Sequence, residues 1–349
     1  RALGQGRGAL AEGDGRGMTD GVPRHIARRS AQGRGLADLR MVTVADGPGA
    51  GGRLVELRTP AGLGADIALD RGGDLLRLSW KGREVGWHSA TMAPHPWPDA
   101  DAEHGLGALR GFDGFLVTCG LDHHGPPSES SAAEARYPLR DVHVHPLHGR
   151  IATAKAELVE KRIDWAEGRI IVELIARQAT VFGEVLELAR RYEVALEAGR
   201  MNLRDRVTNR GFRPARHGLL YHCNIGHPVL EEGTRLTGEG WALIDRLDAG
   251  AAPLDDHVEL VDVGPSPSAG RIGATGGGVA VTLGFDSGAM PVTALWRAFQ
   301  SGTYALGLEP QTDLMNSKTA VLAAGETREY FLTIVLRDAG PDAPARSIS

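Results

Sequence analysis

The chain has 349 residues, of which 42% are hydrophobic and 24% are charged, as is ordinary for a soluble globular protein. Its net charge of −5 does not favour binding to nucleic acid or to an anionic membrane, and no apolar run is long enough to span a bilayer. The 48 glycines and 19 prolines predict many turns. Composition therefore favours a globular fold with a large core.

The two cysteines, Cys119 and Cys223, are too few for a disulfide framework. One bridge between them stays open as an alternative, but a reduced, cytoplasmic protein is favoured. The first residues lack the apolar stretch of a signal peptide. We take Met18 as a candidate start and expect the Gly/Arg-rich residues before it to carry no function.

The order of patterns along the chain predicts strands. Residues 19–40 are basic and predict one or two helical turns. From about 40 to 90, apolar and polar residues alternate over short runs, and turn residues recur roughly every 10 positions. This spacing is typical of antiparallel sheet in a sandwich or barrel. Residues 91–149 are rich in Gly, Pro and His and predict loops around one strand at 114–121.

Strands resume from 150 to 210. Residues 183–199 have helical propensity, but their apolar side chains recur with period two, which favours a strand. Further strands are predicted at 215–232, 256–263, 278–285, 290–299, 302–309 and 328–337. We therefore predict an all-β protein, a large antiparallel β-sandwich with few short helices. Residues 36–340 would form one domain, and residues 1–35 an extension that is partly disordered or foreign to the native chain.

Residues 221–228, YHCNIGHP, predict a strand with one polar face. Alternation places His222, Asn224 and Gly226 on one face, and Tyr221, Cys223 and Ile225 on the other. The polar face either meets water or lines a site. Cys223 follows His222 directly, but the two side chains point to opposite faces, so a cysteine nucleophile activated by this histidine is disfavoured and Cys223 is expected in the core.

Residues 301–313, SGTYALGLEPQTD, predict a second informative strand. Ala305, Gly307 and Glu309 share one face, so the carboxylate lies beyond small residues that leave room for a ligand. The alternative is a surface glutamate at a strand end. A glutamate and a histidine on separate strands can act as general base and general acid. Such a pair suits the opening of a hemiacetal ring, which moves two protons and needs no cofactor.

The 13 histidines concentrate between positions 123 and 227. His143 and His145 share a strand face and could hold a divalent transition metal, although a third ligand cannot be placed. The alternative is a solvated strand edge. Arg150, Arg213 and Arg216 make an anionic substrate conceivable, but no phosphate-binding loop has the required glycine spacing.

Several segments together resemble the aldose 1-epimerase (galactose mutarotase-like) superfamily, most closely its uncharacterised DUF4432 subfamily. These segments cover roughly residues 60–315 and read ALDRGGDLLRLSWKGREVGW, LRGFDGFLVTCGLDHHGPP, LHGRI, YHCNIGHPVLEEGTRL and GLEPQTD. The resemblance implies the galactose mutarotase-like supersandwich. It implies His222 as general acid and Glu309 as general base, because these residues match the histidine strand motif and the Glu-x-Gln-like strand end of mutarotases.

The resemblance also implies that the LHGR segment binds sugar hydroxyls. The chain departs from the mutarotase pattern in two places. The residues after His222 are CNI, where the acid motif of mutarotases has YFN. The DHHG segment at 122–125 belongs to the subfamily, and the mutarotases imply no role for it. Trp87 or Trp296 could stack on the sugar. The residues expected to contact substrate are Arg71, Asp122, His124, His148, Arg150 and Asn224.

The sequence thus predicts a mutarotase that interconverts sugar anomers without a metal or cofactor. One alternative is a non-catalytic carbohydrate-binding protein on the same fold. Another is a metal-dependent sugar isomerase or lyase that uses His123, His124, His143, His145 or His148. The expected partner is a small sugar or sugar derivative, with no nucleic acid and no membrane, and the expected assembly is a monomer or homodimer.

Overall fold

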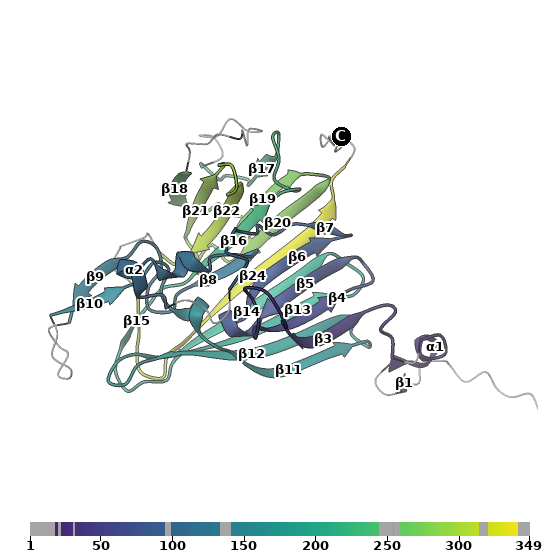
Figure 1. Cartoon of the computed structure of the whole chain (residues 1–349), viewed down its shortest axis with the longest axis horizontal. Coiled ribbons are helices and arrows are strands. Elements are labelled where there is room, and N and C mark those ends of the chain that lie inside the picture. Colours follow the sequence, from purple (N-terminus) through teal and green to yellow (C-terminus); the bar gives the residue numbers. More distant parts are fainter. Residues whose placement is uncertain are drawn as a thin grey trace, which may run out of the picture.

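A computed structural model describes residues 18–19, 22–30, 32–94, 99–132, 141–243, 254, 259–313 and 320–340. Two large antiparallel sheets dominate the fold, as Figure 1 shows. The all-β sandwich predicted from alternation and turn spacing is therefore confirmed. Residues 1–17, which were expected to carry no function, lie outside the described residues.

The ten-stranded sheet carries both strands singled out in the sequence. Its order is β18-β21-β22-β16-β8-β6-β5-β4-β3, with β7 paired to β6. The strands are β3 (Asp38–Thr43), β4 (Arg53–Arg58), β5 (Leu63–Ala68), β6 (Asp74–Trp80), β7 (Arg83–Glu84), β8 (Leu116–Cys119), β16 (Leu220–Gly226), β18 (Glu259–Pro265), β21 (Val292–Ala298) and β22 (Ala305–Gln311).

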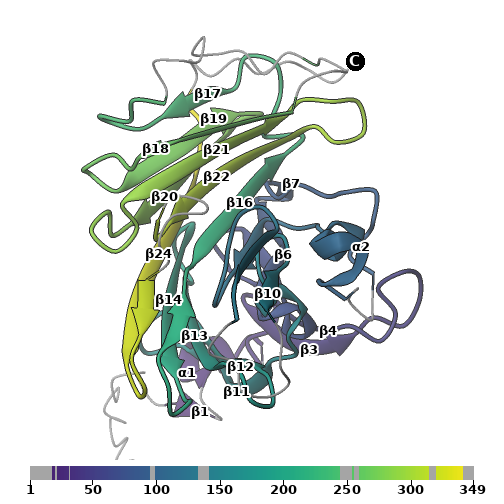
Figure 2. The same ribbon diagram turned by 90° about the vertical axis from the view of Figure 1, so that its left-hand side faces the viewer.

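The eight-stranded sheet packs against it and has the order β11-β12-β13-β14-β24-β20-β19-β17. Figure 2 shows β24 and β14 of this sheet to the left of β16 and β6 of the other sheet. The strands are β11 (Glu157–Asp164), β12 (Arg169–Ala179), β13 (Val185–Ala195), β14 (Arg200–Asn209), β17 (Arg235–Thr237), β19 (Arg271–Gly276), β20 (Val279–Phe285) and β24 (Thr327–Asp338).

The remaining elements are short. The N-terminal helix α1 (Arg24–Ala27) confirms the predicted helical turn. The loop-rich stretch contains two paired strands, β9 (Ser128–Ser131) and β10 (Val142–His145); β10 carries the expected strand face of His143 and His145, whereas β9 was not predicted. These elements are β1 (Met18–Thr19), β2 (Val22–Pro23), α1 (Arg24–Ala27), η1 (Leu69–Arg71), α2 (Ala102–Gly105), η2 (Gly107–Arg110), β9 (Ser128–Ser131), β10 (Val142–His145), η3 (Ile151–Thr153), β15 (Ala215–His217) and β23 (Ala320–Leu322).

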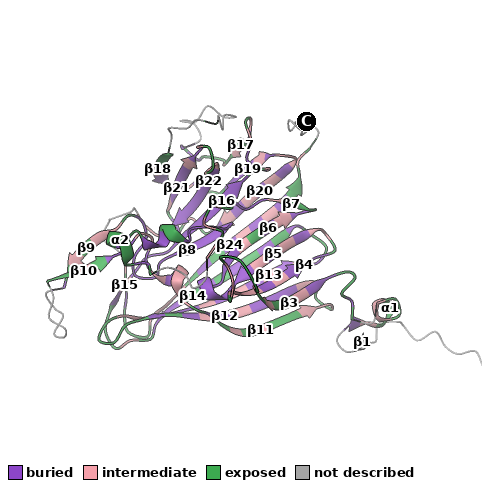
Figure 3. Ribbon diagram, in the orientation of Figure 1, coloured by how far each residue is buried: buried purple, intermediate pink, exposed green. Residues whose placement is uncertain are grey.

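The core lies between the two sheets and is built largely from alternate residues of their strands; Figure 3 shows how burial varies along the ribbon. In β14, for example, Met201, Leu203, Asp205 and Val207 are buried while the residues between them are exposed. The ambiguous segment around β13 is a strand for the same reason, since only an extended chain brings its alternate apolar residues to one side. No helix of the described residues is long and apolar enough to cross a membrane.

A buried ionic cluster ties the two sheets together behind β16. Arg190 on β13 makes two hydrogen bonds to the carboxylate of Asp205 on β14, at 2.8 and 2.6 Å. Arg190 also donates to Thr118 on β8, and the hydroxyl of Tyr221 donates to Asp205. The strand that presents His222 is therefore held from its core side by charge-assisted hydrogen bonds.

Candidate active site

Strand β16 presents His222 on the face of the ten-stranded sheet that points away from the core. Tyr221 and Cys223 belong to the inter-sheet core, while Leu220 belongs to a separate small cluster on the other face. His222 and Asn224 are both buried. The alternation predicted for this strand is therefore confirmed. Cys119 and Cys223 are both free and buried.

Strand β22 runs antiparallel beside β16 and brings Glu309 to the same place. The register pairs Cys223 with Leu308 and Asn224 with Gly307, so that His222 falls opposite Glu309. The atoms His222 Nε2 and Glu309 Oε1 lie 3.1 Å apart, and both side chains are at most 5% exposed. The two residues proposed as acid and base are thus neighbours within the reach of proton transfer.

Gly307 makes this close approach possible. A Cβ atom at position 307 would lie 2.7 Å from Glu309 Oε1 and 3.1 Å from His222 Cε1, both tighter than ordinary contacts. The bare backbone of Gly307 therefore leaves the space that the carboxylate and the imidazole occupy. From the sequence we expected the small residues before Glu309 to leave room for a ligand. The space over Gly307 is instead occupied by the side chains of Glu309 and His222.

Aromatic rings surround His222. The rings of Phe112 and Trp296 meet its imidazole edge to face, with centroids 4.9 and 5.3 Å away. Trp87 packs against both of these rings, so both tryptophans proposed for stacking belong to the cluster, although only Trp296 is paired with His222. Phe112 was missed in the sequence, because it lies in a loop outside any periodic pattern.

Asn224 fixes which nitrogen of His222 carries a proton. Asn224 Nδ2 donates to Gly114 O at 3.0 Å, and Asn224 Oδ1 lies 2.5 Å from His222 Nδ1. A backbone carbonyl only accepts, so the amide nitrogen must face Gly114 and the amide oxygen must face the ring. That oxygen also only accepts, so Nδ1 carries the proton. In the neutral ring, Nε2 can then accept a proton from Glu309.

Burial controls the charges of the pair. It raises the pKa of Glu309 from its usual value to about 8. It lowers the pKa of His222 to about 4, against the opposing effect of the hydrogen bond to Asn224. Each group is therefore favoured in its neutral form at neutral pH, because an unsolvated charge is costly in this apolar surrounding. The pair then carries one exchangeable proton, which rests on Glu309 while His222 Nε2 is unprotonated.

His148 of the LHGR segment reaches the pair. Its ring lies edge to face with His222 at a centroid distance of 5.3 Å and stacks with Phe112 at 6.1 Å. The backbone of His148 bonds to both ends of the 120–125 segment: its carbonyl accepts from Gly120 N at 2.9 Å, and its N–H donates to Gly125 O at 2.8 Å. The DHHG segment therefore acts at least as the support of His148.

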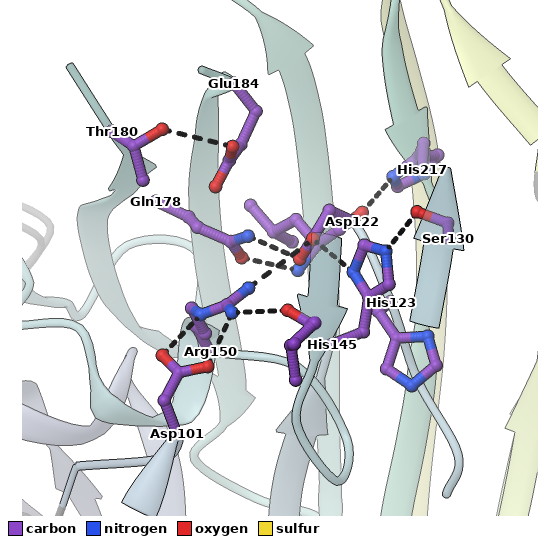
Figure 4. A network of polar contacts seen from close by, with 12 residues as sticks. Asp101, Asp122, His123, Ser130, His145, Arg150, Gln178, Thr180, Glu184 and His217 are labelled. Atoms are coloured by element: carbon purple, nitrogen blue, oxygen red, sulfur yellow. Dashed lines mark hydrogen bonds and ion pairs between the residues drawn. The ribbon is translucent and has the colours of Figure 1, made fainter. Parts of the chain in front are cut away.

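Asp122 and Arg150 meet in a polar network beside this support, shown in Figure 4. Asp122 accepts hydrogen bonds from Gln178 and His145, and burial, which raises its pKa, is outweighed by these bonds and by Arg150, so that the pKa falls to about 2. Arg150 holds Asp101 through two hydrogen bonds. The structure thus brings Asp122 and Arg150 close to each other. Their side chains contact other members of this polar network.

The other two proposed contact residues, His124 and Arg71, are each held by a hydrogen bond of their own. His124 Nε2 bonds to Asp313 Oδ1 at 2.6 Å, just beyond the end of β22. Arg71 is buried and donates to Asp113 O at 2.8 Å, next to Phe112. His227, which follows the last residue of β16, is exposed. Arg213 is exposed as well.

Two of the histidines considered as metal ligands bond to other groups. His145 bonds to Ser130 and Asp122, and His123 Nε2 bonds to Pro126 O. Within the described ranges, no group of three or more His, Cys, Asp or Glu side chains is arranged to hold a metal ion.

Comparison with known proteins agrees with the fold. A family model described as a domain of unknown function, DUF4432, matches residues 49–330. A candidate aldose 1-epimerase from Klebsiella pneumoniae superposes with a TM-score of 0.75 at 22% identity, covering 86% of this chain and 83% of that one. A galactose mutarotase-like protein from Clostridium acetobutylicum gives a TM-score of 0.63 at 14% identity, with 87% and 100% covered. No curated protein matches.

Proposed function

Since this chain belongs to the DUF4432 family and has the galactose mutarotase-like fold, we propose that it interconverts the anomers of a sugar. Glu309 would be the general base and His222 the general acid. The observation that carries this proposal is the 3.1 Å approach of the two side chains from adjacent strands, on a face walled by aromatic rings. The names of the structural neighbours support a sugar-type ligand. Fold alone does not determine function, so the site carries the argument.

At neutral pH Glu309 rests protonated and His222 rests neutral, so the reacting form of the pair arises by a proton transfer within it. Transfer of its one proton from Glu309 to His222 Nε2 gives a carboxylate beside an imidazolium, that is, one base and one acid. The hydrogen bond from His222 Nδ1 to Asn224 is kept in both forms. Asn224 is therefore proposed to orient the acid through its ring, in addition to any contact with substrate.

The reaction then balances without another reagent. Glu309 takes the proton of the anomeric hydroxyl, His222 protonates the ring oxygen, and the bond between that oxygen and C1 breaks to give the open-chain aldehyde. Rotation about the C1–C2 bond turns the other carbonyl face toward the ring oxygen. Ring closure returns one proton to His222 and takes one from Glu309, so the pair ends as it began.

The aromatic cluster and His148 are proposed to hold the sugar. The face of Trp296 or Trp87 can pack on the apolar face of a sugar ring, while His148 offers a polar edge beside the pair. Arg71, Asp122, His124 and Arg150 are proposed as further hydroxyl contacts or as supports of those that touch the sugar. An uncharged sugar fits better than a phosphorylated one, because Arg150 is already bonded to Asp101 and Arg213 is exposed.

The test is an exchange NMR screen of the purified protein against free and phosphorylated aldoses. We expect the rate of exchange between α and β anomers to rise with protein concentration for at least one free aldose. Sugar binding without faster exchange would contradict the enzyme and favour a carbohydrate-binding protein. Exchange that appears only when a divalent metal is added would favour the metal-dependent alternative.

A further inference from the structure

Gln311 is the last residue of β22 and lies on the same face as Glu309, two positions away. Its partner across the sheet is Leu220, whose side chain belongs to the aromatic cluster around His222. The side chain of Gln311 therefore points to the side of the sheet that holds the acid–base pair. Two strand residues of the same face lie about 7 Å apart, which is comparable with the span of one sugar ring.

The amide of Gln311 is fully buried, and neither its Oε1 nor its Nε2 has a hydrogen-bond partner among the described residues. The other buried side-chain amides among the described residues have hydrogen-bond partners. Gln178, for example, donates to Asp122 and accepts from Leu121 N, and Asn209 donates to two carbonyls and accepts from Gly211 N. Buried amides without partners are rare because their desolvation is not compensated.

We propose that Gln311 is a substrate-binding residue that holds a hydroxyl group of the sugar next to the reacting centre. This inference rests on the proposed function. A primary amide offers donors and an acceptor side by side, and a hydroxyl group can both accept and donate, so the two satisfy each other. The amide carries no charge that would balance the charge of a phosphate. The bound group would therefore be a neutral hydroxyl at a carbon other than C1.

Such a site would also set specificity. A buried polar group that bonds a substrate hydroxyl discriminates strongly against an analogue without it, because the group is then left unpaired. His124 shows a related feature nearby. Its Nδ1 is buried without a partner in the described part of the chain, while its Nε2 is fixed by Asp313, two residues after Gln311. The polar surface thus continues beyond Glu309 toward the end of β22.

The experiment compares the wild type with Gln311→Met, which keeps the length of the side chain and removes its hydrogen bonds. Each protein is assayed by exchange NMR on an accepted aldose and on its monodeoxy analogues. We expect KM for the aldose to rise at least tenfold in the variant, with kcat changed less. The wild type should discriminate against one deoxy analogue at least tenfold more than the variant does, which a purely structural role would not produce.

Chemical denaturation supplies the matched control. Gln311→Met should keep or raise the unfolding midpoint, because it removes an unpaired amide. Gln178→Met should lower it, because Asp122 and the N–H of Leu121 each lose a hydrogen-bond partner. Unchanged KM and unchanged discrimination in Gln311→Met would overturn the assignment of Gln311 while leaving the enzyme intact. If the wild type shows no exchange at all, the proposed function fails. In that case, saturation-transfer NMR with the same sugars tests whether Gln311 binds sugar. Equal sugar binding by the wild type and by Gln311→Met would overturn the assignment of Gln311.

Discussion

Glu309 and His222 together hold one exchangeable proton over a wide range of pH. With the pKa of His222 lowered to about 4 and that of Glu309 raised to about 8, the one-proton form predominates between these values. Both shifts are caused chiefly by burial of the site. Catalysis by one acid and one base requires this form, so the pH range of activity follows from burial of the site.

We therefore predict a bell-shaped dependence of kcat/KM on pH. Below about pH 4 both groups are protonated and no base remains, and above about pH 8 both are deprotonated and no acid remains. The measurement is the initial rate of anomer exchange from pH 3.5 to 9.5, corrected for the buffer-catalysed rate. A rate that stays flat through pH 8 and above would contradict the assignment of Glu309 to the pair.

Gly307 gives a second test at the scale of one residue. Gly307→Ala would place a methyl group against Glu309 Oε1, His222 Cε1 and Trp296 Cβ. The carboxylate can move aside, so the fold should survive, but the pair would separate. We expect kcat to fall at least 100-fold, as is typical when a general acid or base is misplaced, with an unfolding midpoint close to that of the wild type.

The control for this variant is Gly284→Ala on β20, where the added methyl group would meet only Thr333 Cβ at 3.7 Å. It should leave the exchange rate unchanged. If Gly307→Ala keeps the wild-type kcat, the close approach of the two side chains is not needed for the reaction.

At the scale of elements, strand patterns were readable from the sequence and loop contacts were not. Alternation with period two is a local property, so it placed His222, Asn224 and Glu309 on their faces correctly. The position of Phe112 over His222 depends on a loop whose path is set by distant contacts, such as the bond from Arg71 to Asp113 O. The pairing of Arg150 with Asp101 is non-local in the same way.

The LHGR segment shows why a motif can be recognised before its structural reason is known. Gly149 has a φ of +74°, and a Cβ atom there would lie 2.2 Å from Gly120 O and 2.4 Å from His123 O. Both neighbours are backbone atoms that cannot turn aside. The glycine after His148 is therefore required by the DHHG segment that passes against it, and neither segment alone reveals this contact.

We predict that Gly149→Ala lowers the free energy of unfolding by more than about 2 kcal/mol, because the strain of a positive φ adds to a backbone clash. It should also raise KM, since His148 loses its support. Chemical denaturation and exchange kinetics measure the two effects. Gly168→Ala is the matched control, because its φ is +63° but no atom lies within 4 Å of the added methyl group. Equal destabilisation by both variants would contradict the role given to the close contact.

At the scale of the whole molecule, two sheets are joined by an apolar core with an ionic cluster inside it. Arg190 and Asp205 are completely buried, and Tyr221 connects Asp205 to the strand of His222. Removing one member of a buried ion pair leaves the other charge uncompensated, which costs more than the pair contributes when intact. The fold class followed from the strand patterns, whereas this cluster was invisible in them because its members come from separate strands.

We predict that Asp205→Asn lowers the free energy of unfolding by about 3–5 kcal/mol, as for other broken buried pairs. Urea denaturation provides the measurement. The surface pair of Arg204 and Glu329 is the comparison, because Glu329→Gln on the exposed side should cost less than about 1 kcal/mol. A cost below 1 kcal/mol for Asp205→Asn would show that the cluster does not hold the sheets together.

The central claim is that Glu309 and His222 perform anomer exchange, and Glu309→Gln tests it most directly. Glutamine has the same shape but cannot take the proton of the anomeric hydroxyl. Exchange NMR on the aldose accepted by the wild type should show a loss of kcat of at least about 100-fold, with an unfolding midpoint at neutral pH equal to that of the wild type or higher, because a buried ionisable group has been removed. Full exchange activity in folded Glu309→Gln protein would contradict the account.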